Sequence, residues 1–322
     1  MIRIFFAVLR ITFSIGADFY ESELYDKLNN VIAKDSILID EPMSRHTTFR
    51  VGGPADFFVT PKAKEEVRDV IRICKEAGMP YYIIGNGSNL LVSDAGYRGV
   101  IVQIYKEMNE VKVEGDLVKA QAGALLSGIA AKALGAELSG FEFASGIPGT
   151  IGGACVMNAG AYGGEMKDVL ESVTVLTGEG KIIELGRNEL ELGYRTSVIA
   201  KEGYIVLGAV LKLERGNGEK IKTYMDELKE KRVTKQPLEY PSAGSTFKRP
   251  EGYFAGKLIE DAGLRGFQVG GAQVSEKHCG FVINRDHATA ADIMELMRQV
   301  QIRVKENSGV DLEPEVKRLG DE

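Results

Sequence analysis

The spacing of hydrophobic residues predicts short strands alternating with amphipathic helices, the pattern of an α+β chain. In the first part, an apolar strand at residues 57–59 is followed by a helix and by a second strand at residues 81–84. We expect the helix to begin with Thr60 as its cap and Pro61 at its first position, and to end before Gly78. Its apolar stripe has helical spacing and consists of Val67, Val70, Ile71 and Cys74.

The middle of the chain is predicted to form a strand-rich region with one helix. The helix is expected at residues 125–134, and residues 178–180 are expected to form a hairpin turn. The strands are expected at residues 100–104, 111–114, 117–122, 173–176, 182–185 and 204–213.

The pair Asn217-Gly218 separates this region from a C-terminal part with more helix. The last helix is expected to open with a capping box of Thr289 and Asp292 and to end at Gly309. The other elements are two helices, a strand and an extended tail, expected at residues 219–232, 257–262, 280–284 and 310–319.

These patterns predict three parts of the chain. Residues 1–19 form an N-terminal extension, residues 20–215 a domain of two lobes and residues 216–322 a C-terminal α+β domain. The two lobes are expected at about residues 20–80 and 81–215. A ligand is expected to lie between them.

Composition narrows the class of protein. The net charge of −6 and a pI near 5.4 exclude a nucleic-acid-binding footprint. Three scattered cysteines predict a reducing compartment, and the three histidines have no metal-ligand spacing. The N-terminal apolar run is interrupted at Arg10 and lacks a cleavage site, so we expect a dispensable extension and a cytoplasmic protein without a membrane segment.

Two glycine-rich segments are the strongest candidates for a ligand site. Residues 146–164 read GIPGTIGGACVMNAGAYGG, and residues 85–89 read GNGSN directly after the strand at 81–84. Segments with so little side chain let main-chain N–H groups approach phosphate oxygens. The alternative is that these glycines only make turns. Neither segment is a Walker A loop or a complete Rossmann fingerprint.

Six motifs in one order resemble the UDP-N-acetylenolpyruvoylglucosamine reductase family. They cover roughly residues 40–320 and are Gly85-Asn-Gly-Ser-Asn89, Ile147-Pro-Gly-x-x-Gly-Gly153, Asn158-Ala-Gly-Ala-Tyr-Gly163, Tyr194-Arg-x-Ser197, Gly244-Ser245-x-Phe247 and Leu312-x-x-Glu-Val316. The resemblance implies FAD in a fold of the vanillyl-alcohol-oxidase (PCMH) type, NADPH as reductant, and a separate substrate domain. The short connection after Leu213 resembles the family's shorter, type II branch, which lacks an inserted tyrosine loop.

The implied cofactor set lies in the two glycine segments. FAD is expected to be noncovalent, because the segment at residues 85–89 has no histidine or cysteine, although His46 lies upstream. The expected FAD contacts are Arg50, Gly85, Asn86, Gly87, Ser88, Asn89, Gly146, Gly149, Gly152, Gly153, Asn158 and Gly160.

The family's chemistry implies a hydride delivered to C3 of an enolpyruvyl ether and a proton delivered to C2. Ser245 is the expected acid, Arg195 the support for the developing enolate, and Glu315 the group that orients the reacting end. The alternatives are that Ser245 bonds only its own turn, that Arg195 pairs with Glu189 or Glu191, and that Glu315 is a solvated tail carboxylate. Glu313 would share a strand face with Glu315, so only the motif spacing separates them.

The substrate is expected to meet a tyrosine and several cations. These are Tyr194, Lys248, Arg249 and Lys257, although a helical lysine such as Lys257 is commonly only solvated. We expect a monomer that acts on small molecules. Two other readings stay open: a different flavin oxidase or dehydrogenase on the same scaffold, and a flavin or nucleotide-sugar binding protein without catalysis.

Overall fold

The computed structural model describes residues 22–320 of the chain, so the predicted N-terminal extension lies outside the described residues. Residues 22–29 are helical and pack Leu24 and Leu28 against the main core. A four-stranded sheet follows, with the order β1-β2-β5-β3. Its strands are β1 (Ile37–Pro42), β2 (Pro54–Val59), β3 (Tyr81–Ile84) and β5 (Tyr97–Gln103). This sheet takes in strands beyond residue 80, so the division between the lobes comes after β5.

The helix α2 (Lys64–Glu76) links β2 to β3, and both strands run parallel to β5 between them. The predicted apolar stripe is buried, but the predicted start is wrong. The N–H of Thr60 donates to the carbonyl of Ser36, which keeps Thr60 beside the sheet. Ala63 is therefore the N-cap, and the Glu66 carboxylate accepts from the N–H of Lys62 at 2.7 Å.

A five-stranded antiparallel sheet forms the second lobe, with the order β12-β11-β13-β7-β6. Its strands are β6 (Val111–Glu114), β7 (Leu117–Gln121), β11 (Leu170–Leu176), β12 (Ile182–Gly186) and β13 (Ile205–Lys212). The helix α3 (Leu126–Gly135) and the short helix α4 (Ile151–Val156) accompany it. Part of the glycine segment at residues 146–164 (the second along the chain) is therefore helical, although its sequence pattern did not predict a helix. Short pieces complete the lobe: β8 (Leu138–Ser139), β9 (Gly160–Ala161), β10 (Gly164–Glu165), α5 (Met166–Val169), α6 (Val198–Glu202) and β14 (Glu214–Arg215).

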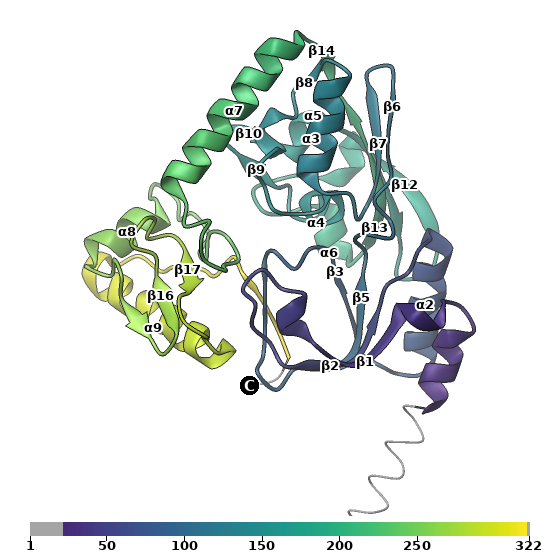
Figure 1. Cartoon of the computed structure of the whole chain (residues 1–322), viewed down its shortest axis with the longest axis horizontal. Coiled ribbons are helices and arrows are strands. Elements are labelled where there is room, and N and C mark those ends of the chain that lie inside the picture. The colour runs from purple at the N-terminus through teal and green to yellow at the C-terminus, as the bar shows by residue number, and fades with distance from the viewer. Residues whose placement is uncertain (1–21, 321–322) are drawn as a thin grey trace, which may run out of the picture.

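The long helix α7 (Gly218–Lys235) leads from the second lobe to the C-terminal domain (Figure 1). There, α8 (Ala255–Asp261) and α9 (Ala290–Ser308) pack with the sheet β15 (Gln268–Val269), β16 (Ala272–Val274) and β17 (Val282–Asn284). The capping box of Thr289 and Asp292 and the left-handed Gly309 confirm both predicted ends of α9. The domain has a hydrophobic core of its own, which also takes in Phe49, Val51 and Leu91.

The chain then returns to the first lobe. The strand β18 (Lys317–Leu319) pairs in parallel with β4 (Leu90–Val92), which directly follows the GNGSN segment. Asp94, just past β4, accepts hydrogen bonds from the first N–H groups of α9. Within residues 22–320, no helix is both long enough and apolar enough to span a membrane.

Candidate active site

Arg195 lies at the tip of a tight turn. The N–H of Gly193 donates to the carbonyl of Thr196 at 3.1 Å, and the N–H of Thr196 donates back at 3.3 Å. Arg195 has φ +55°, a left-handed conformation that disfavours residues with a side chain. Ser197, fully buried, donates to the carbonyl of Val156 at 2.6 Å and caps α6, so the turn is fixed to the second glycine segment.

The Arg195 side chain meets the tail of the chain. Its Nε lies 2.7 Å from Oε1 of Glu315, and the two side chains are only 21% and 11% exposed. The N–H of this Nε is not aligned for a hydrogen bond, so the contact is an ion pair. Burial raises the pKa of Glu315, and the charge of Arg195 opposes part of that rise. The two other carboxylates considered as partners of Arg195 have partners of their own. Glu191 pairs with Lys201, and the Glu189 carboxylate accepts from the N–H of Gly186.

Glu315 is held by segments that are distant in the sequence. Its N–H donates to the carbonyl of Thr246 at 2.9 Å, and its carbonyl accepts from the side chain of Asn89 at 3.2 Å. Glu313 points elsewhere: its carboxylate pairs with Lys248 and is 70% exposed. The structure thus separates two carboxylates that the sequence pattern could not.

Ser245 follows Gly244, whose φ of +76° makes the sharp turn that exposes the serine. Together with Arg195 and Glu315 it lines a cavity of about 520 Å³, which we call the serine cavity. The three predicted catalytic side chains therefore face one space. Its wall carries the cations Arg249, Lys257, Arg265 and Lys277, together with Glu260 and with His278, whose pKa is lowered by burial. Arg265, Lys277 and His278 were not predicted from the sequence, because only the fold brings them close to Ser245.

The predicted substrate contacts are divided between two cavities. Tyr194 lines the serine cavity, is 55% exposed, and accepts a hydrogen bond from the N–H of Arg249 at 3.0 Å. The Arg249 guanidinium lies 3.9 Å from the ring centre of Phe254, while Lys257 pairs with Asp261 at 2.7 Å. Lys248 lies outside the serine cavity and lines the neighbouring one.

That neighbouring cavity, the glycine cavity, has a volume of about 300 Å³ and lies against both glycine segments. Its wall includes residues 85–89. Arg195 and Glu315, which line the serine cavity, line this cavity as well. The side chain of Asn86 donates to the carbonyl of Pro148 at 2.9 Å, which joins the two segments. The ion pair therefore stands between the glycine cavity and the serine cavity.

The glycines of the glycine cavity differ in the space around them. A Cβ at Gly149 or Gly153 would meet no atom closer than 3.6 Å, so side chains there would fill free space. A Cβ at Gly85 would instead lie 2.3 Å from Oγ1 of Thr150, and one at Gly87 would lie 2.0 Å from the carbonyl oxygen of His46. Some glycines thus leave room for a ligand and others allow the loops to touch.

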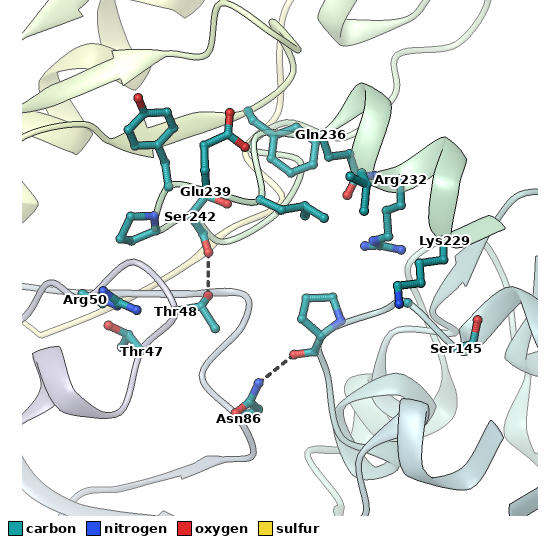
Figure 2. Close-up of a pocket in the computed structure, with 18 of the residues that line it drawn as sticks. Thr47, Thr48, Arg50, Asn86, Ser145, Lys229, Arg232, Gln236, Glu239 and Ser242 are labelled. Atoms are coloured by element: carbon teal, nitrogen blue, oxygen red, sulfur yellow. Dashed lines mark hydrogen bonds between the residues drawn. The ribbon is translucent and has the colours of Figure 1, made fainter. Parts of the chain in front are cut away.

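A third cavity, of about 900 Å³, extends from the glycine segments to α7 (Figure 2). Arg50, Asn86 and Gly146 from the predicted cofactor set line it. Lys229 and Arg232 reach into it from α7 and were missed, because the sequence gives them only as polar positions of a helix. Burial lowers the pKa of Arg232.

Three members of the predicted cofactor set do not line these cavities. A Cβ at Gly152 would lie 3.0 Å from the carbonyl of Ala122, and one at Gly160 would lie 2.7 Å from the side chain of Glu165. Asn158 is 1% exposed and all its side-chain hydrogen bonds go to the protein. Close packing accounts for the two glycines, and hydrogen bonds inside the protein account for Asn158.

The part of the chain that the structure describes holds no cluster of three or more histidine, cysteine or acidic residues suited to a metal ion. The ring of His46 stacks on Phe58 at 3.9 Å, and its Nε2 lies 2.9 Å from Glu41.

Comparison with known proteins decides the family. Residues 55–186 match a family described as FAD binding domain, and residues 236–319 match the UDP-N-acetylenolpyruvoylglucosamine reductase C-terminal domain. A protein of that name from Clostridioides difficile (strain 630) is 53% identical over 300 residues, covering 93% of this chain and 99% of its own length. The chain belongs to the UDP-N-acetylenolpyruvoylglucosamine reductase family.

Other members of the reductase family support the assignment over the full fold. The reductase from Agathobacter rectalis is 56% identical over 297 residues, which cover 88% of this chain and 94% of its own. The crystal structure of the Thermus caldophilus enzyme superposes with a TM-score of 0.75 at 37% identity, covering 88% of this chain and 98% of that one. The α+β architecture and the FAD-binding class predicted from the sequence are thereby confirmed.

Proposed function

We propose that Ser245, Arg195 and Glu315 form the reaction centre for the activity that family membership assigns to this chain. That activity is the FAD-dependent reduction of UDP-N-acetylglucosamine enolpyruvate to UDP-N-acetylmuramate with NADPH, a step of peptidoglycan synthesis. The observation that supports this proposal best is that the three side chains line one cavity, although they come from three separate segments.

The glycine cavity and the third cavity fit FAD. Main-chain groups of residues 85–89, the open positions Gly149 and Gly153, and the cations Arg50 and Lys317 would hold a diphosphate and its attached rings. When bound, FAD supplies the relay that accepts a hydride from NADPH and delivers it to C3 of the enolpyruvyl ether. Asn158, Gly152 and Gly160 are left out of this set.

Ser245 is proposed to deliver the proton to C2. Its hydroxyl is exposed at the loop tip, and the cations in the wall of the serine cavity favour a developing serine oxyanion. A positioned general acid contributes about 10²–10⁴-fold to the rate.

Arg195 is proposed to stabilise the negative charge that builds up on the substrate carboxylate and C2. Its left-handed backbone and its ion pair with Glu315 fix the guanidinium before substrate arrives, and such preorganisation lowers the barrier. Glu315 holds Arg195 in that direction and faces the serine cavity itself.

The basic wall of the serine cavity is proposed to bind the nucleotide diphosphate. Arg249 and Lys257 belong to it, and the missed residues Arg265 and Lys277 lie in the same wall. Tyr194 closes one side. We also propose that the protein is a cytoplasmic monomer of three parts, with α7 as the link between the FAD-binding domain and the substrate domain.

Anaerobic half-reactions test the function. Purified protein is expected to be yellow, to be bleached by NADPH, and to recover its flavin absorbance on addition of UDP-N-acetylglucosamine enolpyruvate. Recovery with oxygen but not with this substrate would point to another flavin oxidase, and protein without a reducible flavin would point to a binding protein.

A further inference from the structure

The side chain of Asn158 is fully engaged inside the protein. Its amide nitrogen donates to Oε2 of Glu165 at 2.8 Å and to the carbonyl of Gly193 at 3.0 Å, while its oxygen accepts from the N–H of Lys167 at 2.9 Å. A primary amide has two donor hydrogens, and both are used. With 1% exposure, Asn158 has no donor left for a ligand.

One of these bonds ends on the turn that carries Arg195. The Gly193 carbonyl also accepts a longer bond from the N–H of Thr196 at 3.3 Å, so the Asn158 bond is the shorter of the two. The turn needs such support because Arg195 has φ +55°, which is unfavourable for arginine. Asn158 itself has φ +45°, a conformation that asparagine tolerates better than most residues.

The second bond organises a charge near the same arginine. Glu165 lies 2.9 Å from the ammonium of Lys167 and accepts from Asn158. The pKa of Glu165 is lowered, and its contact with Lys167 is the largest cause. The hydrogen bond from Asn158 and the charge of Arg195 lower the pKa further. Asn158 thus joins the base of the Arg195 turn to an anchored carboxylate.

We propose that Asn158 is a positioning residue for Arg195, which sets the direction in which the guanidinium leaves the turn toward Glu315. This proposal rests on the function proposed for Arg195. It gives Asn158 itself a role in the reaction with substrate and no direct contact with FAD.

Two substitutions separate the hydrogen bonds from backbone strain. Asn158→Gly removes the side chain and adopts the left-handed backbone without steric strain. Asn158→Asp keeps the size and the bond from Lys167, but it places a carboxylate oxygen beside Glu165 and the Gly193 carbonyl. Either variant should still fold around FAD, because Asn158 itself lines neither cofactor cavity; only its neighbours Met157 and Ala159 do.

The test compares the two half-reactions of the holoenzyme under anaerobic conditions. We expect both variants to keep full flavin content, and the rate of flavin reduction by NADPH to stay within about two-fold of wild type. The rate of flavin reoxidation by UDP-N-acetylglucosamine enolpyruvate should fall by about 10- to 100-fold. Asn217→Ala, which removes the cap of α7 far from this turn, is the control: it should lower the melting temperature and leave reoxidation unchanged.

A double-mutant cycle gives the decisive result. In an Arg195→Ala background, Asn158→Gly should change reoxidation by less than about two-fold, because the residue it positions is gone. Additive losses, equal slowing of both half-reactions, or loss of flavin from the variants would each overturn the proposal. If wild-type reduced protein is not reoxidised by this substrate, the proposed function fails before Asn158 is in question.

Discussion

The side chain of Asn89 donates a hydrogen bond to the main-chain carbonyl of Glu315, with 3.2 Å between nitrogen and oxygen. The N–H of Lys317 donates back to the carbonyl of Asn89 at 3.1 Å, and β18 then continues along β4. The loop proposed to hold FAD and the carboxylate proposed to act with Arg195 are therefore one hydrogen-bonded unit. A substitution that moves the loop at residues 85–89 should therefore also move Glu315, and the reverse should hold.

Replacing Ser245 with alanine should separate the two half-reactions. Reduction of the flavin by NADPH should stay near the wild-type rate, and reoxidation by the enolpyruvyl substrate should fall by about 10²–10⁴-fold, because the proton donor is lost. Anaerobic stopped-flow absorbance measures both. Ser308→Ala at the end of α9 is the matched control, and normal turnover of the Ser245 variant would refute the acid role.

Glu315→Gln should change the pH dependence of stability. Burial raises the pKa of Glu315 in the folded protein above its value in the unfolded chain. The protonated carboxyl therefore stabilises the fold at low pH, and this stabilisation is lost as the pH rises through the raised pKa. The melting temperature of the variant minus that of wild type should therefore increase from about pH 4 to about pH 7. A difference that stays constant across this range would contradict the pKa assignment.

Gly87→Ala should release the cofactor. Gly87 has φ +62°, and a Cβ there would lie 2.0 Å from the carbonyl oxygen of His46, so the loop backbone must move. Gly115→Ala is a matched control with φ +68° and free space around it, and it should cost only about 1–2 kcal/mol of stability. The ratio of flavin to protein absorbance after purification measures the effect. Equal flavin content in the two variants would mean that the loop contact is not required.

Asp94→Ala should destabilise the contact between the first lobe and the C-terminal domain. The carboxylate accepts from the N–H groups of Ala290 and Ala291 at 2.8 and 3.0 Å, so it caps α9 from another domain. Loss of a helix cap costs about 0.5–2 kcal/mol, which urea unfolding can resolve. Thr289→Ala, which removes the helix's own cap, provides the scale. No change in the Asp94 variant would show that water replaces this cap.

Much of the secondary structure could be predicted because its signals are local. The ends of α9 follow from Thr289, Asp292 and Gly309, which act within one turn of the helix. The strand β3 follows from a short apolar run before a glycine loop. The predicted start of α2 was wrong, because the N–H of Thr60 bonds to the carbonyl of the distant Ser36 and Thr60 therefore does not cap the helix.

For the site, the sequence by itself determined the kinds of chemistry present: glycine segments, an exposed serine, an arginine and a tail carboxylate. Only the tertiary structure decided which groups meet. It turned Glu315 toward Arg195 and Glu313 toward Lys248, brought Arg265 and Arg232 to cavity walls, and buried Asn158 beneath the arginine turn. The physical reason is that hydrogen bonds and burial between distant segments fix side-chain direction, and these forces leave no mark on local residue spacing.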